Sequence, residues 1–183
     1  FNYLDVISNY INTSKIYTNV EEESTTGFGN IVYVVVDSKG YTTEYSEIPS
    51  NLPVDTYSVK AVIPADPNGN WDEFEMDVAV EFNVNKTDIT GSTVTPDDTL
   101  EYTGVNQTIG FEVKHGETVL TEGIDYTLTI TKDGVEVSRN AILNAGEYEV
   151  TVTGKNNFDG KKTITFNVAK HQVEIVAPES VED

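Results

Sequence analysis

The sequence predicts an all-β protein made of two tandem antiparallel β-sandwich domains, and three observations support this fold class. Several segments alternate apolar and polar residues with a period of two, which is typical of a strand with one packed and one solvated face. No segment of useful length has the three-and-four spacing of an amphipathic helix. A block of sequence also occurs twice, and two copies of one β unit indicate a tandem array.

The repeated block begins near Pro53 and near Asn144, and it closes each time with Phe-Asn-Val-x-Lys. The first copy has the longer connection between its tyrosine and its phenylalanine, and a hairpin loop can absorb this difference. We predict domains at residues 1–85 and 86–170, with 171–183 as a linker or the start of a further repeat. The aligned positions are Tyr57 with Tyr148, Val59 with Val150, Asn70-Trp71 with Asn157-Phe158, and Phe82-Asn-Val with Phe166-Asn-Val.

Strand formers bounded by turn residues place the elements of the first domain. Residues 1–20 are β-rich and could hold its first strands, whereas the polar, glycine-marked residues 21–29 predict a loop. The apolar run at 30–40 predicts a strand that ends in an Asp-Ser-Lys-Gly turn, with a returning strand at 41–48. Strands follow at 56–63 and 76–84, and the second of these carries Met76, Val78, Val80, Phe82 and Val84 on one packed face.

The second domain follows the same logic. Residues 86–98 mix strand formers with turn residues and predict both the linker and a first strand. Asp133-Gly134 is a strong hairpin signal. The remaining strands are predicted at 100–104, 111–116, 119–126, 126–132, 148–152 and 164–168.

Charge excludes one class of function. The chain has 11 Lys and Arg against 31 Asp and Glu, which gives a net charge of −20 and a pI near 4.2. Nucleic acid and anionic membrane surfaces would repel such a protein, because both bind through Lys and Arg. We therefore predict no nucleic-acid partner.

Cysteine is absent from the sequence, so disulfides, thiolate metal sites and cysteine nucleophiles are absent too. An exported protein without disulfides fits a bacterial surface that does not rely on oxidative folding. No apolar stretch approaches the length that spans a membrane, and the first residues do not form a signal peptide. The chain starts and stops abruptly, and we expect it to be a segment of a longer protein.

Catalytic chemistry has little support in the sequence. Only His115 and His171 could serve as a histidine base. The first lies beside a turn glycine and the second in the linker, so we expect both to be exposed loop residues. Paired carboxylates for glycoside hydrolysis are defined by their separation in space, so the sequence alone does not decide them. The three adjacent carboxylates at 21–23 fit a solvated acidic loop better than a metal site. We predict a protein that is not an enzyme, with no catalytic, cofactor-binding or metal-binding residue and no cofactor.

One loop partly matches a calcium-binding motif. Asp66, Asn68, Asn70 and Asp72 place oxygen ligands at alternate positions, as the first part of such a loop does. Glycine falls at the fourth position instead of the sixth, however, and the twelfth residue is Asp77 instead of glutamate. The sequence leaves open whether this loop binds calcium.

Two lysines raise the question of a covalent crosslink. Lys86 and Lys170 each follow Phe-Asn-Val, and some surface domains join a lysine to an asparagine against mechanical force. Asn83 and Asn167 have the wrong parity for the core, which argues against this chemistry.

Aromatic residues of the first domain could stack on sugars. Trp71, Tyr41 and Tyr45 would do so if they lay exposed on one edge. The alternative is that Trp71 fills one end of the sandwich.

The second copy contains four blocks in a fixed order: Tyr102-Thr-Gly, Leu120-x-Glu-Gly-x-Asp-Tyr126, Asn144-Ala-Gly-x-Tyr-x-Val-x-Val-x-Gly-x-Asn-x-Phe-x-Gly160 and Phe166-x-Val. With these blocks it resembles the tandem bacterial Ig-like repeats (MBG type) of cell-wall surface and adhesin proteins. The resemblance covers the whole second copy, and the first copy resembles a divergent relative with Val54-Asp55 where the family carries Ala-Gly. It implies a small Ig-like β-sandwich, export, attachment to the cell wall and a stalk or adhesin role, and it supplies no catalytic residues.

Tyr57 and Tyr148 resemble the corner tyrosines of sandwich folds, whose hydroxyl ties a strand to a neighbouring loop. The alternative is that each ring simply fills the core. Gly146 is expected to allow a tight turn before its strand, where a side chain would clash.

From these patterns we expect an extracellular stalk module that spaces or presents an adhesive region and continues into further Ig-like repeats. The alternative is an adhesin module that binds a carbohydrate or another cell-surface or protein ligand of the host. A weaker alternative is an accessory segment of a secreted enzyme.

Overall fold

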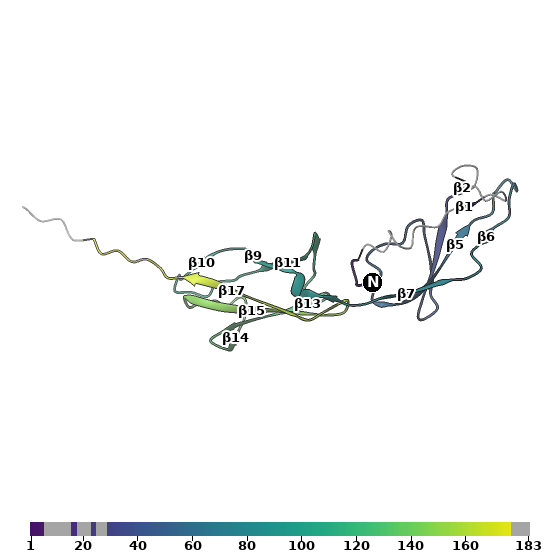
Figure 1. Ribbon diagram of the computed structural model, residues 1–183. Helices are drawn as coiled ribbons and strands as arrows, with labels where there is room; N and C mark the ends of the chain where they lie inside the picture. The colour runs from purple at the N-terminus through teal and green to yellow at the C-terminus, as the bar shows by residue number, and fades with distance from the viewer. Residues whose placement is uncertain (6–15, 18–22, 25–28, 177–183) are drawn as a thin grey trace, which may run out of the picture. The chain divides into compact units, whose positions relative to one another are not determined.

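The computed structural model describes residues 1–5, 16–17, 23–24 and 29–176 (Figure 1). Over these residues the chain is all-β, with mainly antiparallel sheets, one 3₁₀ turn and no α-helix, as predicted. Most of the predicted first strands and of the acidic loop at 21–29 lies outside the described residues. Ile16–Tyr17 (β1) pairs with Glu23–Ser24 (β2), so residues 23–24 of that predicted loop form a short strand instead.

The chain divides into two compact units. Unit 1 comprises Phe1–Thr87 with Asn156–Phe158, and unit 2 comprises Asp88–Lys155 with Asp159–Asp183. The predicted repeat limits at 85/86 and 170/171 remain predictions.

Unit 1 is built on one antiparallel sheet in which β5 is central. The strand order is β4-β3-β5-β6, and β7 also pairs with β5. The core lies on one face of this sheet and gathers Tyr33, Val35, Tyr57, Val59, Phe82 and Val84 with Ile48 and Leu52 from the connection before β5. The strands are Val32–Asp37 (β3), Thr42–Tyr45 (β4), Asp55–Ile63 (β5), Phe74–Glu75 (β6) and Val80–Val84 (β7).

The predicted packed strand over 76–84 is wrong in its first half. Glu75 pairs with Val62 and Val80 with Val59, so residues 76–79 face only two residues of β5. This bulge places Val78 in solvent and leaves Val80 half exposed, whereas Phe82 and Val84 are buried as expected. The Met76 sulfur accepts the Ala61 amide at 3.3 Å within the bulge.

Unit 2 contains a five-stranded sheet in the order β10-β17-β15-β13-β14 and a three-stranded sheet in the order β12-β11-β9. All neighbours are antiparallel except β10 and β17, which run parallel. The large sheet consists of Leu100–Glu101 (β10), Tyr126–Lys132 (β13), Val135–Val137 (β14), Gly146–Gly154 (β15) and Lys161–Ala169 (β17). The small sheet consists of Thr93–Pro96 (β9), Phe111–His115 (β11) and Thr118–Val119 (β12), and Thr87–Asp88 (β8) pairs with Phe158–Asp159 (β16).

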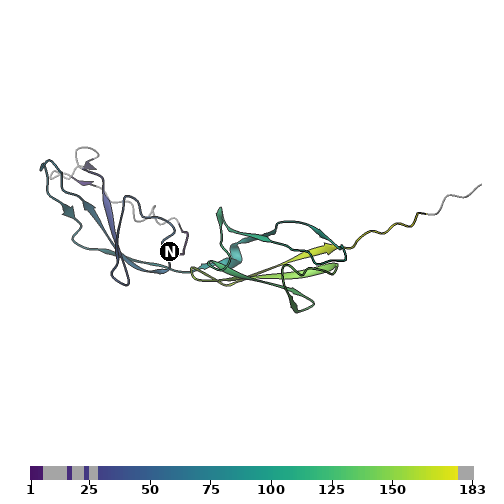
Figure 2. The same ribbon diagram turned by 180° about the vertical axis from the view of Figure 1, so that it is seen from behind.

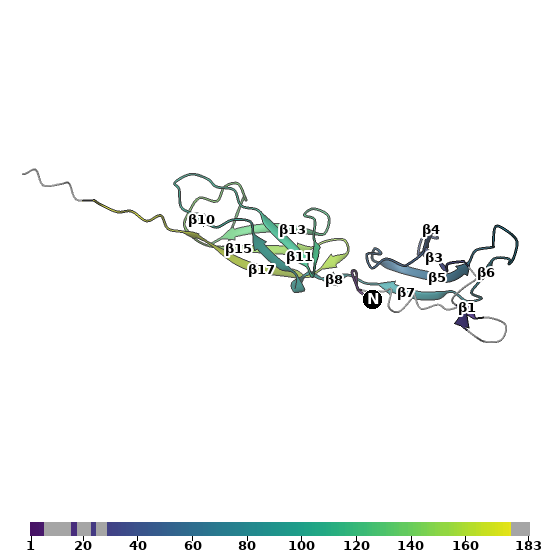
Figure 3. The ribbon, with the colours of Figure 1, turned by 90° about the horizontal axis from the view of Figure 1, so that it is seen from above.

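The two sheets of unit 2 form two layers around one core. Figure 1 shows β9 and β11 above β15 and β17, and in the view from above β11 is drawn across the same two strands (Figure 3). Phe111 of β11 meets Phe166 of β17 edge to face, with ring centroids 5.6 Å apart. Ile130, Ile142, Tyr148 and Val150 fill the space beside them. The 3₁₀ turn Ile89–Gly91 (η1) packs against β15 and β17.

The two units repeat the same strand register. Tyr57 pairs with Phe82 across β5 and β7, and Tyr148 pairs with Phe166 across β15 and β17. Counted from these pairs, β4, β3, β5 and β7 correspond to β14, β13, β15 and β17.

The correspondence extends to the first residues of the chain. Asn2 forms a parallel bridge to Asn85 just beyond β7, as Glu101 pairs in parallel with Ala169 of β17. The N-terminus accordingly lies beside β7 in views from both sides (Figures 1 and 2). Phe1-Asn-Tyr therefore stands in unit 1 where Leu100-Glu-Tyr stands in unit 2.

Candidate functional site

The two aligned tyrosines make the same hydrogen bond in both units. The Tyr57 hydroxyl donates to the Pro53 carbonyl at 2.9 Å, and the Tyr148 hydroxyl donates to the Asn144 carbonyl at 2.8 Å. Each acceptor lies four residues upstream, in the loop that leads into the strand. The geometry of these hydrogen bonds therefore confirms the tyrosine-corner interpretation. Each ring is also buried in the core, so both alternatives are correct at once.

Each corner ring also stacks on the phenylalanine of the closing strand. The Tyr57 and Phe82 centroids are 5.5 Å apart with planes 24° from parallel, and those of Tyr148 and Phe166 are 5.1 Å apart at 16°. Such ring pairs contribute beyond the area they bury. The repeated residues of the sequence thus form one packing motif twice.

The electrostatic surroundings of the two tyrosines differ. Burial, followed by the carboxylates of Asp55 and Asp37, raises the pKa of Tyr57 to about 12. The Lys132 ammonium lies instead over the Tyr148 ring, 4.7 Å from its centroid. By register, Lys132 occupies the position of Asp37 in unit 1, so the charge beside the corner is reversed.

Gly146 is the first residue of β15, and its backbone conformation accounts for the glycine. Its φ of 117° lies in a region that favours glycine, and a Cβ there would lie 2.9 Å from the Lys132 ammonium nitrogen.

The candidate calcium loop is organised around the Asp66 carboxylate. Asn70 donates its backbone amide to Asp66 Oδ2 at 3.2 Å and also its side-chain amide, and Asn68 Nδ2 lies 3.4 Å from Oδ1. The Gly69 amide donates to the Asp66 carbonyl at 2.9 Å. These donors occupy the oxygens that a cation would need.

The pKa of Asp66 reflects the same contacts. Burial raises it, but hydrogen bonds from Asn70 and Asn68 outweigh burial, so the pKa lies below its ordinary value. Within the described residues, no three His, Cys, Asp or Glu side chains cluster in a way that could hold a metal ion. The geometry describes an Asx-type turn.

His115 is placed differently from the prediction. It lies at the end of β11 and is half-buried, with Nδ1 3.1 Å from the Ser92 hydroxyl oxygen. Phe111, Val113 and His115 share one parity, and this is the signal that could have placed it. Expecting an exposed loop histidine was wrong because His115 is the last residue of the strand and its ring lies against the buried Ser92.

Ser92, His115 and the nearby Asp88 have the composition of a catalytic triad. The Thr90 amide and hydroxyl, and then the charge of His115, lower the pKa of Asp88. Ser92 is buried, however, and a nucleophile must be reachable by its substrate. The three residues instead tie η1 to the end of β11.

His171 is exposed, as predicted, and its Nδ1 lies 2.8 Å from Glu101 Oε1. Both side chains are more than half exposed, and such surface pairs contribute little to stability.

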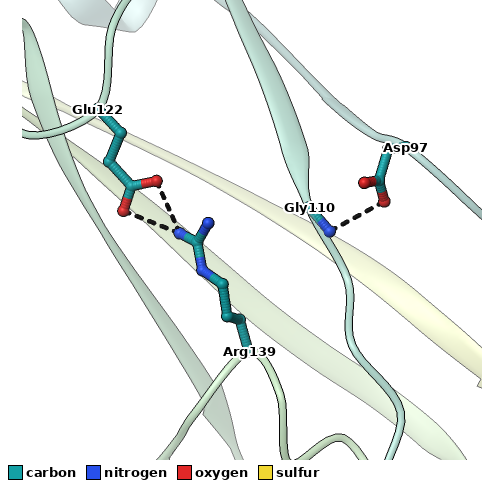
Figure 4. A network of polar contacts seen from close by, with 4 residues as sticks. All are labelled: Asp97, Gly110, Glu122 and Arg139. Carbon is teal, nitrogen blue, oxygen red and sulfur yellow. Dashed lines mark hydrogen bonds and ion pairs between the residues drawn. The ribbon is translucent and has the colours of Figure 1, made fainter.

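Two further polar contacts hold loops of unit 2 (Figure 4). One terminal nitrogen of Arg139, the only arginine in the sequence, donates to both carboxylate oxygens of Glu122 at 2.8 Å. The Asp97 carboxylate accepts the Gly110 amide at 2.9 Å, and a Cβ at Gly110 would collide with that carboxylate. Both contacts serve loop packing.

The three aromatic residues proposed to bind sugar do not share one surface. Tyr41 is exposed beside Asp37, which pairs with Tyr57 near the start of β5, whereas Trp71 follows the far end of that strand. Six residues of strand separate these ends by about 20 Å. Tyr45 packs against the core instead, and Trp71 is half-buried and donates its indole N–H to the Pro64 carbonyl at 3.0 Å.

The lysine–asparagine pairs lack the setting for a crosslink. Lys86, Lys170, Asn83 and Asn167 are all exposed. Attack on an amide requires a neutral amine, and burial is what lowers a lysine pKa far enough. Asn83 Oδ1 instead accepts the Thr56 hydroxyl at 2.7 Å.

Comparison with known proteins gives no match to a family model, to a curated protein or to a solved structure. Within the described residues, no helix is long and apolar enough to cross a membrane.

Proposed function

We propose that the chain is a stalk segment of a bacterial cell-surface protein, in which two tandem Ig-like β-sandwich repeats space or present an adhesive region. The observation that carries the proposal is the repeated register of four strands with a tyrosine corner in each copy. An array of this kind gives length and separation, and its repeats contact mainly their neighbours.

The acidity of the chain fits this role. A net charge of −20 keeps neighbouring stalks soluble and mutually repelled. The resemblance of unit 2 to cell-wall repeats supports an extracellular, wall-anchored location with further Ig-like repeats in the same polypeptide.

Location can be tested by labelling intact cells of the source organism with an antibody raised against this segment. Labelling without permeabilisation is the expected result, with a cytoplasmic protein as the negative control. Labelling that appears only after permeabilisation would refute the surface role.

A binding module for a glycan or a host protein is the second candidate, because the longer connection of the first copy carries the exposed Phe74 close to Trp71. A glycan array with the intact chain separates the two functions. A spacer gives no saturable binding, whereas a binding module gives saturable binding that Phe74→Ser weakens and Tyr102→Ser, a matched exposed aromatic of unit 2, does not.

A further inference from the structure

Asn68-Gly69 is the only Asn-Gly pair in the sequence, and it lies in the loop between β5 and β6. An asparagine before glycine is the arrangement in which the next backbone nitrogen most easily reaches the side-chain amide, because glycine has no Cβ in the way and adopts more backbone conformations. Both residues are exposed, so water reaches them. These conditions favour loss of the Asn68 side-chain amide.

The backbone around this pair forms a turn. The Gly69 amide donates to the Asp66 carbonyl at 2.9 Å, with Pro67 and Asn68 between them. Proline before asparagine favours such a turn, and Gly69 follows it with a φ of 76°. The hydrogen bond holds the nitrogen that would attack Asn68, so the turn must open before a reaction can begin.

The Asp66 carboxylate holds the two asparagines of this loop unequally. Asn68 Nδ2 lies 3.4 Å from Asp66 Oδ1, which is long for a hydrogen bond, so this side chain is held loosely. Asn70 donates both its backbone amide and its side-chain amide to Oδ2. The residue after Asn70 is Trp71, whose side chain obstructs the attack that Gly69 allows. Reaction is therefore expected at Asn68 and not at Asn70.

We propose that Asn68 is a self-modification site, at which the Gly69 nitrogen displaces the side-chain amide and the Asp66 hydrogen bonds limit the rate. The Gly69 nitrogen forms a bond to Asn68 Cγ and its proton passes to water, while Nδ2 takes up a proton and leaves as ammonia. Water then opens the resulting cyclic imide at either of its C–N bonds, which gives aspartate or its isoaspartyl isomer. The reaction consumes one water, releases one ammonia and involves no oxidation.

The conversion changes the loop permanently. It replaces a donor that faces Asp66 with a second carboxylate, so an attraction becomes a repulsion between like charges. The isoaspartyl product also adds one carbon to the main chain inside the turn. The Trp71 carbonyl accepts the Asp66 amide at 3.1 Å and closes the loop, so this indole is placed to report its opening. This chemistry is independent of the stalk role.

Peptide mapping of the full chain by mass spectrometry, during incubation in mildly alkaline buffer, measures the reaction. We expect the Asn68 peptide to give two products of equal mass, aspartyl and isoaspartyl, at least about tenfold faster than Asn70 is converted. The rate should rise with pH, because the attacking nitrogen must lose its proton. Asn68→Gln keeps an amide donor on a longer side chain and should leave this position unconverted.

A matched pair of variants tests the control by Asp66. Asp66→Ala releases both asparagines and should speed conversion of Asn68 about fivefold, a factor that the loss of one ordinary hydrogen bond allows. Asp72→Ala removes the same charge from an exposed position of the same loop and should convert as the parent chain does. Unfolding in urea should speed conversion at least as much as Asp66→Ala, because no turn remains.

Trp71 fluorescence tests the effect on the loop. Asn68→Asp should shift the emission to longer wavelength, and circular dichroism should show that its strands are retained. Three results would each overturn the proposal: a folded chain that converts Asn68 no faster than Asn70, equal rates for Asp66→Ala and Asp72→Ala, or an Asn68→Asp emission identical to that of the parent chain.

Discussion

At the residue scale, the two corner tyrosines carry the clearest prediction. Tyr148→Phe keeps the ring but leaves the Asn144 carbonyl without its donor, which should cost about 1–2 kcal/mol of unfolding free energy. Tyr57→Phe should cost unit 1 a similar amount through Pro53. Urea unfolding followed by circular dichroism measures both.

The single tryptophan allows the stability effects of Tyr57→Phe and Tyr148→Phe to be measured separately. Trp71 lies in unit 1, so its fluorescence reports that unit alone. Tyr57→Phe should lower the urea midpoint measured by fluorescence. Tyr148→Phe should leave that midpoint unchanged and shift only the part of the dichroism change that comes from unit 2. Tyr41→Phe, at an exposed ring, is the neutral control. A fluorescence midpoint that moves equally with both corner variants would contradict two independently folding repeats.

The raised pKa of Tyr57 predicts a loss of stability in alkali. Its folded-state pKa is about 12 against an ordinary value of 10, because burial and two carboxylates disfavour the phenolate. The stabilising contribution of the protonated phenol is therefore complete below pH 10 and is lost as the pH rises toward 12. The difference in fluorescence midpoint between the parent chain and Tyr57→Phe should shrink over this window. A constant difference up to pH 12 would be inconsistent with this pKa.

At the element scale, Gly154 limits how closely β15 can approach the hairpin that follows it. A Cβ at Gly154 would lie 2.6–2.8 Å from backbone atoms of Asp159, and backbone cannot move aside as a flexible side chain can. Gly154→Ala should therefore destabilise unit 2 by about 1–3 kcal/mol, as overpacking does. Gly29→Ala has open space around its Cβ and serves as the control in thermal unfolding. Equal melting temperatures for the two variants would rule out the close approach.

The loop between β5 and β6 leads to a prediction about calcium. Because amides of Asn68 and Asn70 already occupy the Asp66 carboxylate, millimolar calcium should leave the melting temperature within about 1 °C of its value in chelator. Fluorescence of Trp71, which ends this loop, provides a local signal for the same titration. A saturable calcium-dependent rise would establish the site that the internal hydrogen bonds argue against.

Prediction from sequence succeeded for the elements that one local rule determines, either the alternation of apolar and polar residues or a turn dipeptide. Alternation placed most strands, and Asp133-Gly134 makes the expected hairpin, with both residues at positive φ. It failed at the bulge of residues 76–79, because alternation continues through a segment whose pairing shifts by two residues.

Two features of the candidate sites could not be decided in advance for other reasons. The sequence pattern is the same whether a tyrosine donates its hydroxyl to a loop carbonyl or only fills the core. The parallel pairing of Phe1-Asn-Tyr was missed because it shares only its tyrosine with Leu100-Glu-Tyr. Whether either contact forms depends on where the fold places the partner backbone, which the local sequence pattern does not reveal.

At the scale of the whole molecule, the excess of carboxylates should oppose folding at low ionic strength. A net charge of −20 on 183 residues repels itself, and salt screens this repulsion. The melting temperature should rise between about 0.02 and 0.5 M NaCl, and KCl should have the same effect. Dilute protein keeps association out of the measurement. No change with either salt would mean that the charges are too well separated to interact.

The parallel pairing of β10 with β17 determines how tension would act on unit 2. β10 is the first strand of the large sheet along the chain and β17 is the last, and the two run in the same direction. Pulling on the two ends of such a pair slides the strands past each other, so the cross-strand bonds bear the load together instead of opening one after another. The same arrangement recurs where Asn2 meets Asn85. Both repeats would therefore resist extension in shear.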